Sequence, residues 1–372
     1  MISIDKQKLL SGFAPMAKVT TSKSHPIYEY VLIECKKGED VLHLTCTNGD
    51  LTVISRIQLT ECAEKDFCTC VQAKLFGDML RSLPNGEVVL GVNDKDAFLD
   101  WGTGKSTLFT AESADFPNTY LVSDPLLKGD LKISGLKQAL RSVAKATADE
   151  DFGRPALSSV FFDSKDGILN VVASDCHQLV CGTLPSTLPD GNILLPDAAA
   201  HLLFVILVIS ESNVVEMTSN NSHVRFDTED FSIISTLVKA KFPNYRAVIP
   251  ENPAGRLYVE KEQILHTAKR AAIFCNKSTG SIGLEFNPGK IRIYSEELAY
   301  GMSLNETVYC EYDGPSINMM VKAEMMIDVL SIINDDRIEI GVTEAMRPLR
   351  IQPEKLENKD ESQVAVIMPT AK

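Results

Sequence analysis

The chain has 372 residues, 44% of them hydrophobic and 23% charged, which is typical of a soluble globular protein with room for two or three domains. Its formal net charge of −13 argues against a protein held on nucleic acid by bulk charge alone, because phosphate binding relies on neutralisation by Lys and Arg. A local basic surface on an acidic body remains compatible with this charge.

The sequence shows no membrane, secretion or disulfide signal. The longest apolar run, residues 201–209, is far shorter than the roughly 20 residues that span a bilayer, and the N-terminus lacks a signal-peptide pattern. The nine cysteines form no CxxC pair. We therefore expect reduced thiols in the cytoplasm, with neither a disulfide framework nor a zinc site.

The predicted elements recur at intervals of about one third of the chain. Each third opens with a segment that has apolar residues at helical spacing, at residues 5–19, 134–148 and 260–274. A hairpin follows, with turns at residues 37–40, 166–167 and 287–289. Each third continues with a second helix, at residues 72–83, 196–206 and 322–333. A strand comes next, at residues 87–92, 213–218 and 337–342.

A repeated tripeptide agrees with this spacing. Phe-Pro-Asn stands at residues 116–118 and 242–244, where Pro fixes φ and Asn favours a turn before a linker. We therefore expect an α+β chain of three similar domains, at residues 1–124, 125–250 and 251–372. Three unrelated α+β domains of similar size are the alternative.

No motif predicts a catalytic or metal site. Residues 101–109, "WGTGKSTLF", look like a phosphate loop, but Leu99 stands where that loop needs Gly, so a hairpin turn is favoured. Asp175, Cys176 and His177 suggest nucleophilic chemistry. Adjacent residues of a strand face opposite sides, however, so we expect Cys176 and His177 to be structural.

Cations gather on predicted helix faces. Lys137, Arg141 and Lys145 follow each other at i, i+4 and i+8, and Lys74 and Arg81 stand seven residues apart. An ordinary solvated face is one reading, and a surface that meets phosphates without reading bases is the other. No aromatic stacking motif or recognition helix accompanies these cations.

Several stretches resemble the bacterial sliding clamp family, the beta subunit of DNA polymerase III. They are "ADFPN" (114–118), "VASDCHQL" (172–179), "KFPNYRAVIP" (241–250), "KRAAIFCN" (269–276) and "VAVIMP" (364–369). The resemblance covers essentially the whole chain. It implies a non-enzymatic processivity factor with three clamp domains per chain. Two chains would join head to tail in a closed ring with helices inside and sheets outside.

The resemblance also implies the partners. Double-stranded DNA would be encircled without sequence readout. The replicative polymerase, the clamp loader and repair proteins would bind through short linear peptides. The protein would act in the cytoplasm at the nucleoid, and it would need no cofactor, metal or membrane. The expected DNA-facing residues are Lys23, Lys74, Arg81, Lys137, Arg141, Lys145 and Arg154. The apolar helix after Pro196 is not expected to add much pore charge.

Two further sites follow from the resemblance. The partner-peptide cleft would comprise Leu157, Ser174, Cys176, His177, Leu179, Pro243, Val248, Val366, Met368 and Pro369. The dimer interface would comprise Leu108, Ile273 and Phe274. Gln178 and Ala247 stand where relatives often have Arg, and Thr370 where they often have a larger apolar residue, so we expect a less basic and shallower cleft.

Two rival functions belong to other classes. A hydrolase using Cys176 and His177 would need a third group to orient the imidazole, and the sequence nominates none. A static adaptor would bind the same partners and never encircle DNA. Retention on circular but not linear DNA separates a clamp from an adaptor.

Overall fold

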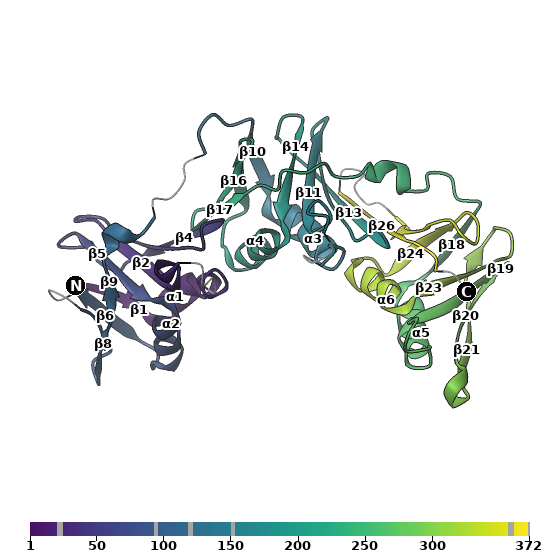
Figure 1. The fold of residues 1–372 in the computed structure, drawn as a ribbon, viewed down its shortest axis with the longest axis horizontal. Coiled ribbons are helices and arrows are strands. Elements are labelled where there is room, and N and C mark those ends of the chain that lie inside the picture. Colours follow the sequence, from purple (N-terminus) through teal and green to yellow (C-terminus); the bar gives the residue numbers. More distant parts are fainter. Residues whose placement is uncertain (21–24, 93–95, 118–121, 150–152, 356–360, 371–372) are drawn as a thin grey trace. The chain divides into compact units, whose positions relative to one another are not determined.

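The structure is a computed structural model that describes all of the chain except residues 21–24, 93–95, 118–121, 150–152, 356–360 and 371–372 (Figure 1). The chain divides into two compact units, residues 1–133 with 198–237, and residues 134–197 with 238–372. In the described part of the chain, each unit holds one four-stranded and one nine-stranded antiparallel sheet. The α+β class predicted from the sequence is confirmed.

The first unit contains the helices α1 (Lys6–Phe13), α2 (Ala73–Ser82) and most of α4 (Asp197–Ile209). Its smaller sheet runs in the order β1 (Ile2–Asp5), β6 (Glu87–Val92), β7 (Ala97–Asp100), β8 (Lys105–Leu108). Its larger sheet runs β10 (Leu127–Lys132), β15 (Val214–Ser219), β16 (His223–Asp227), β17 (Phe231–Thr236), β4 (Leu51–Gln58), β3 (Val41–Thr47), β2 (Tyr30–Cys35), β5 (Phe67–Gln72), β9 (Thr110–Ala111).

The second unit contains most of α3 (Ile133–Val143), with α5 (Lys261–Ile273) and α6 (Ala323–Ile332). Its larger sheet runs β14 (Gly191–Pro196), β11 (Ser159–Lys165), β12 (Ile168–Ser174), β13 (Gln178–Pro185), β26 (Ser362–Ile367), β25 (Leu349–Pro353), β24 (Arg337–Val342), β18 (Gly255–Glu260), β22 (Glu311–Tyr312). Its smaller sheet runs β21 (Met302–Tyr309), β20 (Lys290–Glu297), β19 (Ser281–Asn287), β23 (Ile317–Lys322).

One order of elements recurs along the chain: a strand, a helix and three antiparallel strands. It appears first as β1-α1-β2-β3-β4 and next as β5-α2-β6-β7-β8, and the same pair of motifs then occurs twice more. The helices and hairpin turns predicted from the sequence fall within this order. The turn at residues 101–104 is also a hairpin, in which Trp101 N–H donates to the Gly104 carbonyl at 3.0 Å.

The nine-stranded sheets arise where motifs from different thirds of the chain meet. Strand β4 pairs with β17, from Ser55 opposite Phe231 to Leu51 opposite Ser235. Strand β13 pairs in the same antiparallel way with β26. In both cases the last strand of one third of the chain pairs with the fourth strand of the preceding third of the chain.

Local packing explains how the helices are held. The Asp5 carboxylate begins α1 by accepting from the N–H groups of Gln7 and Lys8. Phe13 of α1 meets Phe76 of α2 edge to face at 5.3 Å, and Gly77 leaves room for the Phe13 ring, which a Cβ would approach to 2.6 Å. The two helices therefore pack closely against each other.

Two predictions of detail are wrong. Lys145 does not continue the face of Lys137 and Arg141, because α3 ends at Val143. Cys176 and His177 lie in the turn between β12 and β13, so alternation along a strand does not place them. Among the described residues, no helix is both long and apolar enough to cross a membrane.

Candidate functional site

A buried cluster in the second unit brings together three predicted cleft residues. Leu157, Leu179 and Val366 pack in one group, and Leu179 on β13 stands directly opposite Val366 on β26. Phe242 and Tyr245 complete the cluster from the segment that follows residue 237. The cluster therefore forms where the second and last thirds of the chain share a sheet.

The segment after Phe242 is fixed to the sheet by aromatic and charged contacts. The Phe242 ring stacks on Phe161 with centroids 4.8 Å apart. The Tyr245 hydroxyl donates to Asp163 Oδ2 at 2.7 Å, and Arg246 Nη2 pairs with the same oxygen at 2.8 Å. Burial raises the pKa of Tyr245 above its usual range, so the phenol stays neutral and keeps donating.

A tight turn stands beside the cluster. Asp175 Oδ1 accepts from the N–H groups of His177 at 2.8 Å and Gln178 at 2.7 Å, and Ser174 Oγ donates to the Gln178 carbonyl at 2.7 Å. Cys176 has a left-handed φ of 75° and, like His177, is exposed. The turn thus presents both side chains to solvent.

The C-terminal segment closes against this turn. Met368 N–H donates to the His177 carbonyl at 2.8 Å, and Thr370 N–H donates to the Met320 carbonyl at 2.8 Å. Met368 and Pro369 are half-buried. Pro243 and Val248 are exposed next to the cluster residues Phe242 and Tyr245.

Two of the three predicted departures have a clear structural setting. Gln178 is only 7% exposed, and its amide nitrogen donates to the Lys145 carbonyl at 2.8 Å, so it turns away from solvent. Thr370 Oγ1 lies 3.2 Å from Ser281 Oγ. Ala247 is exposed beside Arg246, whose guanidinium is held by Asp163.

The expected DNA-facing residues occupy several places. Lys23 lies outside the described residues. Lys74 is exposed on α2, where Arg81 pairs with Asp78 at 2.9 Å. Lys137 is half-buried and Arg141 exposed on α3. Lys145, beyond that helix, bonds Asp328 of α6 through Nζ at 2.6 Å.

Arg154 lies beside the turn that contains Cys176 and His177. Its Nη1 is 3.7 Å from Cys176 Sγ. This position adds a cation to the predicted cleft, which the sequence had suggested would be less basic. Neighbouring sequence gave no signal for the contact, because the two residues are joined only through the fold.

Apolar residues are also exposed directly after β8 and at the end of α5. Phe109, directly after β8, is 75% exposed, whereas Leu108 is only 2% exposed. Ile273, at the end of α5, is 72% exposed, and Phe274 is half-buried. The sequence prediction overlooked Phe109, although alternation along a strand that buries Leu108 puts its neighbour on the opposite face.

The described residues also bear on metal binding and on thiol chemistry. Within them, no group of three or more His, Cys, Asp or Glu side chains could hold a metal ion. Burial raises the pKa of Cys181, in the cluster, to about 12, so this thiol stays protonated at neutral pH.

Comparison with known proteins places this fold in a family. The N-terminal domain of the DNA polymerase III beta subunit matches residues 1–120, and the C-terminal domain of the same subunit matches residues 246–371. The chain belongs to the family of the DNA polymerase III beta subunit.

Curated relatives named beta sliding clamp match along nearly all of the chain. That of Salmonella typhimurium is 26% identical over 348 residues, which cover 92% of each chain. That of Pseudomonas putida is 25% identical over 371 residues, 98% of this chain and 99% of the relative.

Solved structures agree in fold. The DNA polymerase III subunit beta from Pseudomonas aeruginosa has a TM-score of 0.90 at 23% identity and covers 100% of both chains. The beta subunit from Thermotoga maritima has a TM-score of 0.90 at 20% identity, covering 100% of this chain and 99% of the other.

Proposed function

We propose that the chain is a DNA sliding clamp, a processivity factor that encircles duplex DNA and tethers the replicative polymerase and other partners. It comprises three domains, residues 1–124, 125–250 and 251–372. Two copies close head to tail into a ring. The protein acts by topology and by peptide binding and has no catalytic step of its own.

The way the sheets join is the observation that carries this proposal. Strand β4 of the first domain accepts β17 of the second, and β13 of the second accepts β26 of the third. The corresponding strand of the third domain is β21, which ends its sheet, and the strand of the first domain that corresponds to β17 and β26 is β8, which also ends its sheet. A third junction of the same kind therefore pairs β21 with β8 of a second copy.

Such a junction is heterologous, because different surfaces of the two copies meet. Heterologous contacts close into rings when the rotation per subunit allows it. Unpaired edges otherwise invite open-ended association, so a closed ring also satisfies both edges. Phe109 and Ile273 supply exposed apolar area beside these strands, while the buried Leu108 supports β8 from within.

Weak phosphate contacts fit a ring of this kind. A protein retained by topology needs only modest, sequence-blind attraction to slide. Lys137 and Arg141 of α3 and Lys74 of α2 are placed on helices, the elements that line the hole in the proposed ring. The acidic body, with a net charge of −13, disfavours DNA elsewhere on the surface.

The partner cleft lies over the cluster at the second sheet junction. Leu179 and Val366 form its floor, Cys176 and His177 one wall, and Met368 and Val248 offer apolar side chains at its rim. Burying one such side chain contributes about 1.5–3 kcal/mol. A micromolar peptide binds with about 8 kcal/mol, so a few apolar anchors suffice.

Substitutions that introduce a charge test the proposed interface between two copies. We expect Ile273→Asp and Phe109→Asp to give folded monomers, because a carboxylate buried unpaired in an interface costs several kcal/mol. Met346→Asp, at another exposed apolar residue, serves as the control and should stay dimeric. Sedimentation measures the mass. An intact dimer of Ile273→Asp at micromolar concentration would place the interface elsewhere.

The DNA surface is tested by salt dependence. Lys137→Ala combined with Arg141→Ala should weaken DNA association and reduce the slope of log K against log salt by about one unit per lost phosphate contact. The charge-matched control is Lys165→Ala with Lys290→Ala, at exposed residues of two hairpins. Equal slopes for the two double variants would remove α3 from the DNA-binding surface.

The cleft is tested through its exposed thiol. A labelled peptide carrying the clamp-binding segment of the replicative polymerase should slow alkylation of Cys176, because the bound peptide covers that wall. The exposed Cys62 and Cys68 of the first unit are internal controls and should react at unchanged rates. Mass spectrometry of each cysteine reads the result. Unprotected Cys176 at saturating peptide would move the binding site away from this turn.

A further inference from the structure

The buried side chain of Gln178 connects two segments of the second unit. It is the first residue of β13, directly after the cleft turn, and stands opposite Ile367. Its amide nitrogen donates to the Lys145 carbonyl at 2.8 Å and lies 3.4 Å from Asp175 Oδ2. One side chain thus joins the turn to a segment 33 residues earlier in the sequence.

The segment that Gln178 holds forms the other side of the cleft. Ala148 N–H donates to the Leu157 carbonyl at 2.9 Å, and Ala148 packs on the cluster that contains Leu157. Arg154, three residues before Leu157, has its Nη1 3.7 Å from Cys176 Sγ. Residues 154–157 therefore lie beside the Cys176–His177 turn, and the bond from Gln178 to Lys145 joins the start of β13 to the segment that follows α3.

The turn itself does not need this bond. The first domain has the same turn, in which Asn48 Oδ1 accepts from the N–H groups of Asp50 at 3.0 Å and Leu51 at 2.8 Å. Leu51 there occupies the place of Gln178 and has no side-chain donor. The amide of Gln178 is thus an addition found at the turn beside the proposed cleft.

We propose that Gln178 is the positioning residue of the partner cleft, which sets the spacing between the Cys176–His177 turn and the Arg154–Leu157 loop and so the shape offered to the peptide. This inference rests on the proposed peptide-binding function. Gln178 does not touch the peptide, because its side chain is turned inward and is only 7% exposed. It acts through the residues that do.

Lys145 makes a second contact besides the hydrogen bond from Gln178. Its ammonium bonds Asp328 Oδ1 of α6 at 2.6 Å while its carbonyl accepts from Gln178. The segment at Lys145 is therefore anchored to α6 as well as to β13. If the bond from Gln178 is lost, the bond to Asp328 remains, so this segment shifts without the unit unfolding.

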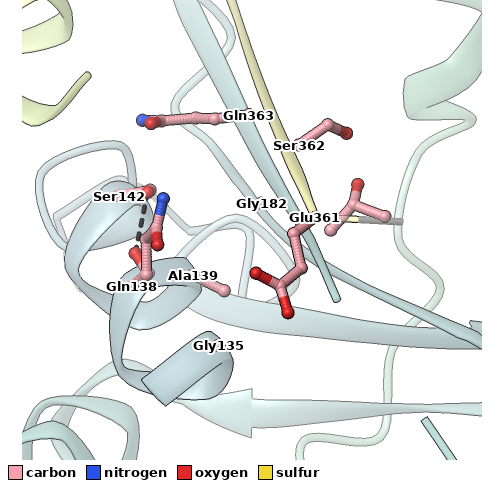
Figure 2. A pocket seen from close by; sticks show the side chains of 9 residues that line it. Gly135, Gln138, Ala139, Ser142, Gly182, Glu361, Ser362 and Gln363 are labelled. Carbon is pink, nitrogen blue, oxygen red and sulfur yellow. Dashed lines mark hydrogen bonds between the residues drawn. The ribbon is translucent and has the colours of Figure 1, made fainter. Parts of the chain in front are cut away.

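A matched pair of substitutions tests the proposal. Gln178→Met keeps the length of the side chain and removes the donor, and we expect it to weaken peptide binding by up to about tenfold, because the free energy of one hydrogen bond is the most that the binding-competent spacing can lose. Gln363→Met is the control. Gln363 on β26 stands opposite Gly182 of β13, the strand that contains Gln178, and is 4% exposed. Its amide has no hydrogen-bond partner among the described residues. Its side chain lies at a cavity of about 10 Å³ (Figure 2).

A pH profile separates a positioning role from general destabilisation. Gln178→Glu places a carboxylate against the Lys145 carbonyl and the Asp175 carboxylate, and both raise its pKa above the usual value of about 4.3. The protonated acid can donate to the carbonyl and the ionised form cannot. The affinity of Gln178→Glu relative to wild type should therefore recover as the pH falls from about 7.5 towards this pKa.

Other titrating groups near the turn are shared by both proteins. They are Asp175, His177, Lys145, Arg154 and Asp328, and the ratio of variant to wild-type affinity at each pH removes the part of their effect that does not depend on residue 178. The probe is the same labelled polymerase peptide, measured by fluorescence anisotropy on the full dimeric protein, with thermal unfolding of each variant recorded alongside.

The outcomes are distinct. Wild-type affinity in Gln178→Met, an equal loss in Gln363→Met, or a flat ratio for Gln178→Glu across the pH range would each overturn the positioning role. Failure of the wild-type protein to bind the peptide would instead overturn the proposed cleft. Weaker binding in Gln178→Met with normal Gln363→Met, together with recovery at low pH, supports the inference.

Discussion

Backbone hydrogen bonding between edge strands is the constraint on which the rest of the structure depends. A strand at the edge of a sheet carries unpaired N–H and C=O groups, and each must find a partner chain, a cover or water. Within the chain, β4 pairs with β17 and β13 with β26, which satisfies four such edges by joining strands from successive thirds of the chain. Strands β8 and β21 are terminal in their sheets, and the proposed ring pairs them between two copies.

One of these junctions also forms the apolar cluster beneath the proposed cleft. Leu179 and Val366 are cross-strand partners only because β13 meets β26, and the apolar cluster beneath the cleft forms around that pair. The last strand of the chain thus has two roles, since its final residues continue past the sheet to bring Met368 against His177. A change in sheet pairing would remove the junction and the cleft together.

Local features were predictable from the sequence and long-range features were not. Helical spacing and Gly-containing turns located helices α1 to α6 and the repeated hairpins, because these signals lie within about a dozen residues. The C-terminal end of α3 was missed, so Lys145 was placed on a helix that stops at Val143. Strand pairing between domains joins residues more than a hundred positions apart, and no local pattern encodes it.

Side-chain direction was the other limit. Gln178 appeared in the sequence as the loss of a cation from the cleft, whereas its amide turns inward to Lys145. Leu108 was assigned to the interface through the resemblance, yet it is buried and its neighbour Phe109 is exposed. In both cases the fold decides which way the side chain points.

Retention on DNA of different topology tests the central claim most directly. The protein is loaded on nicked circular plasmid by the clamp loader of the same organism and separated from free protein at high salt. Half of the complex is then linearised with a restriction enzyme. The protein should stay on circles and be lost from linear molecules, because a closed ring leaves only over a free end. Equal retention on both forms would contradict encirclement and favour a protein that holds DNA by surface contacts.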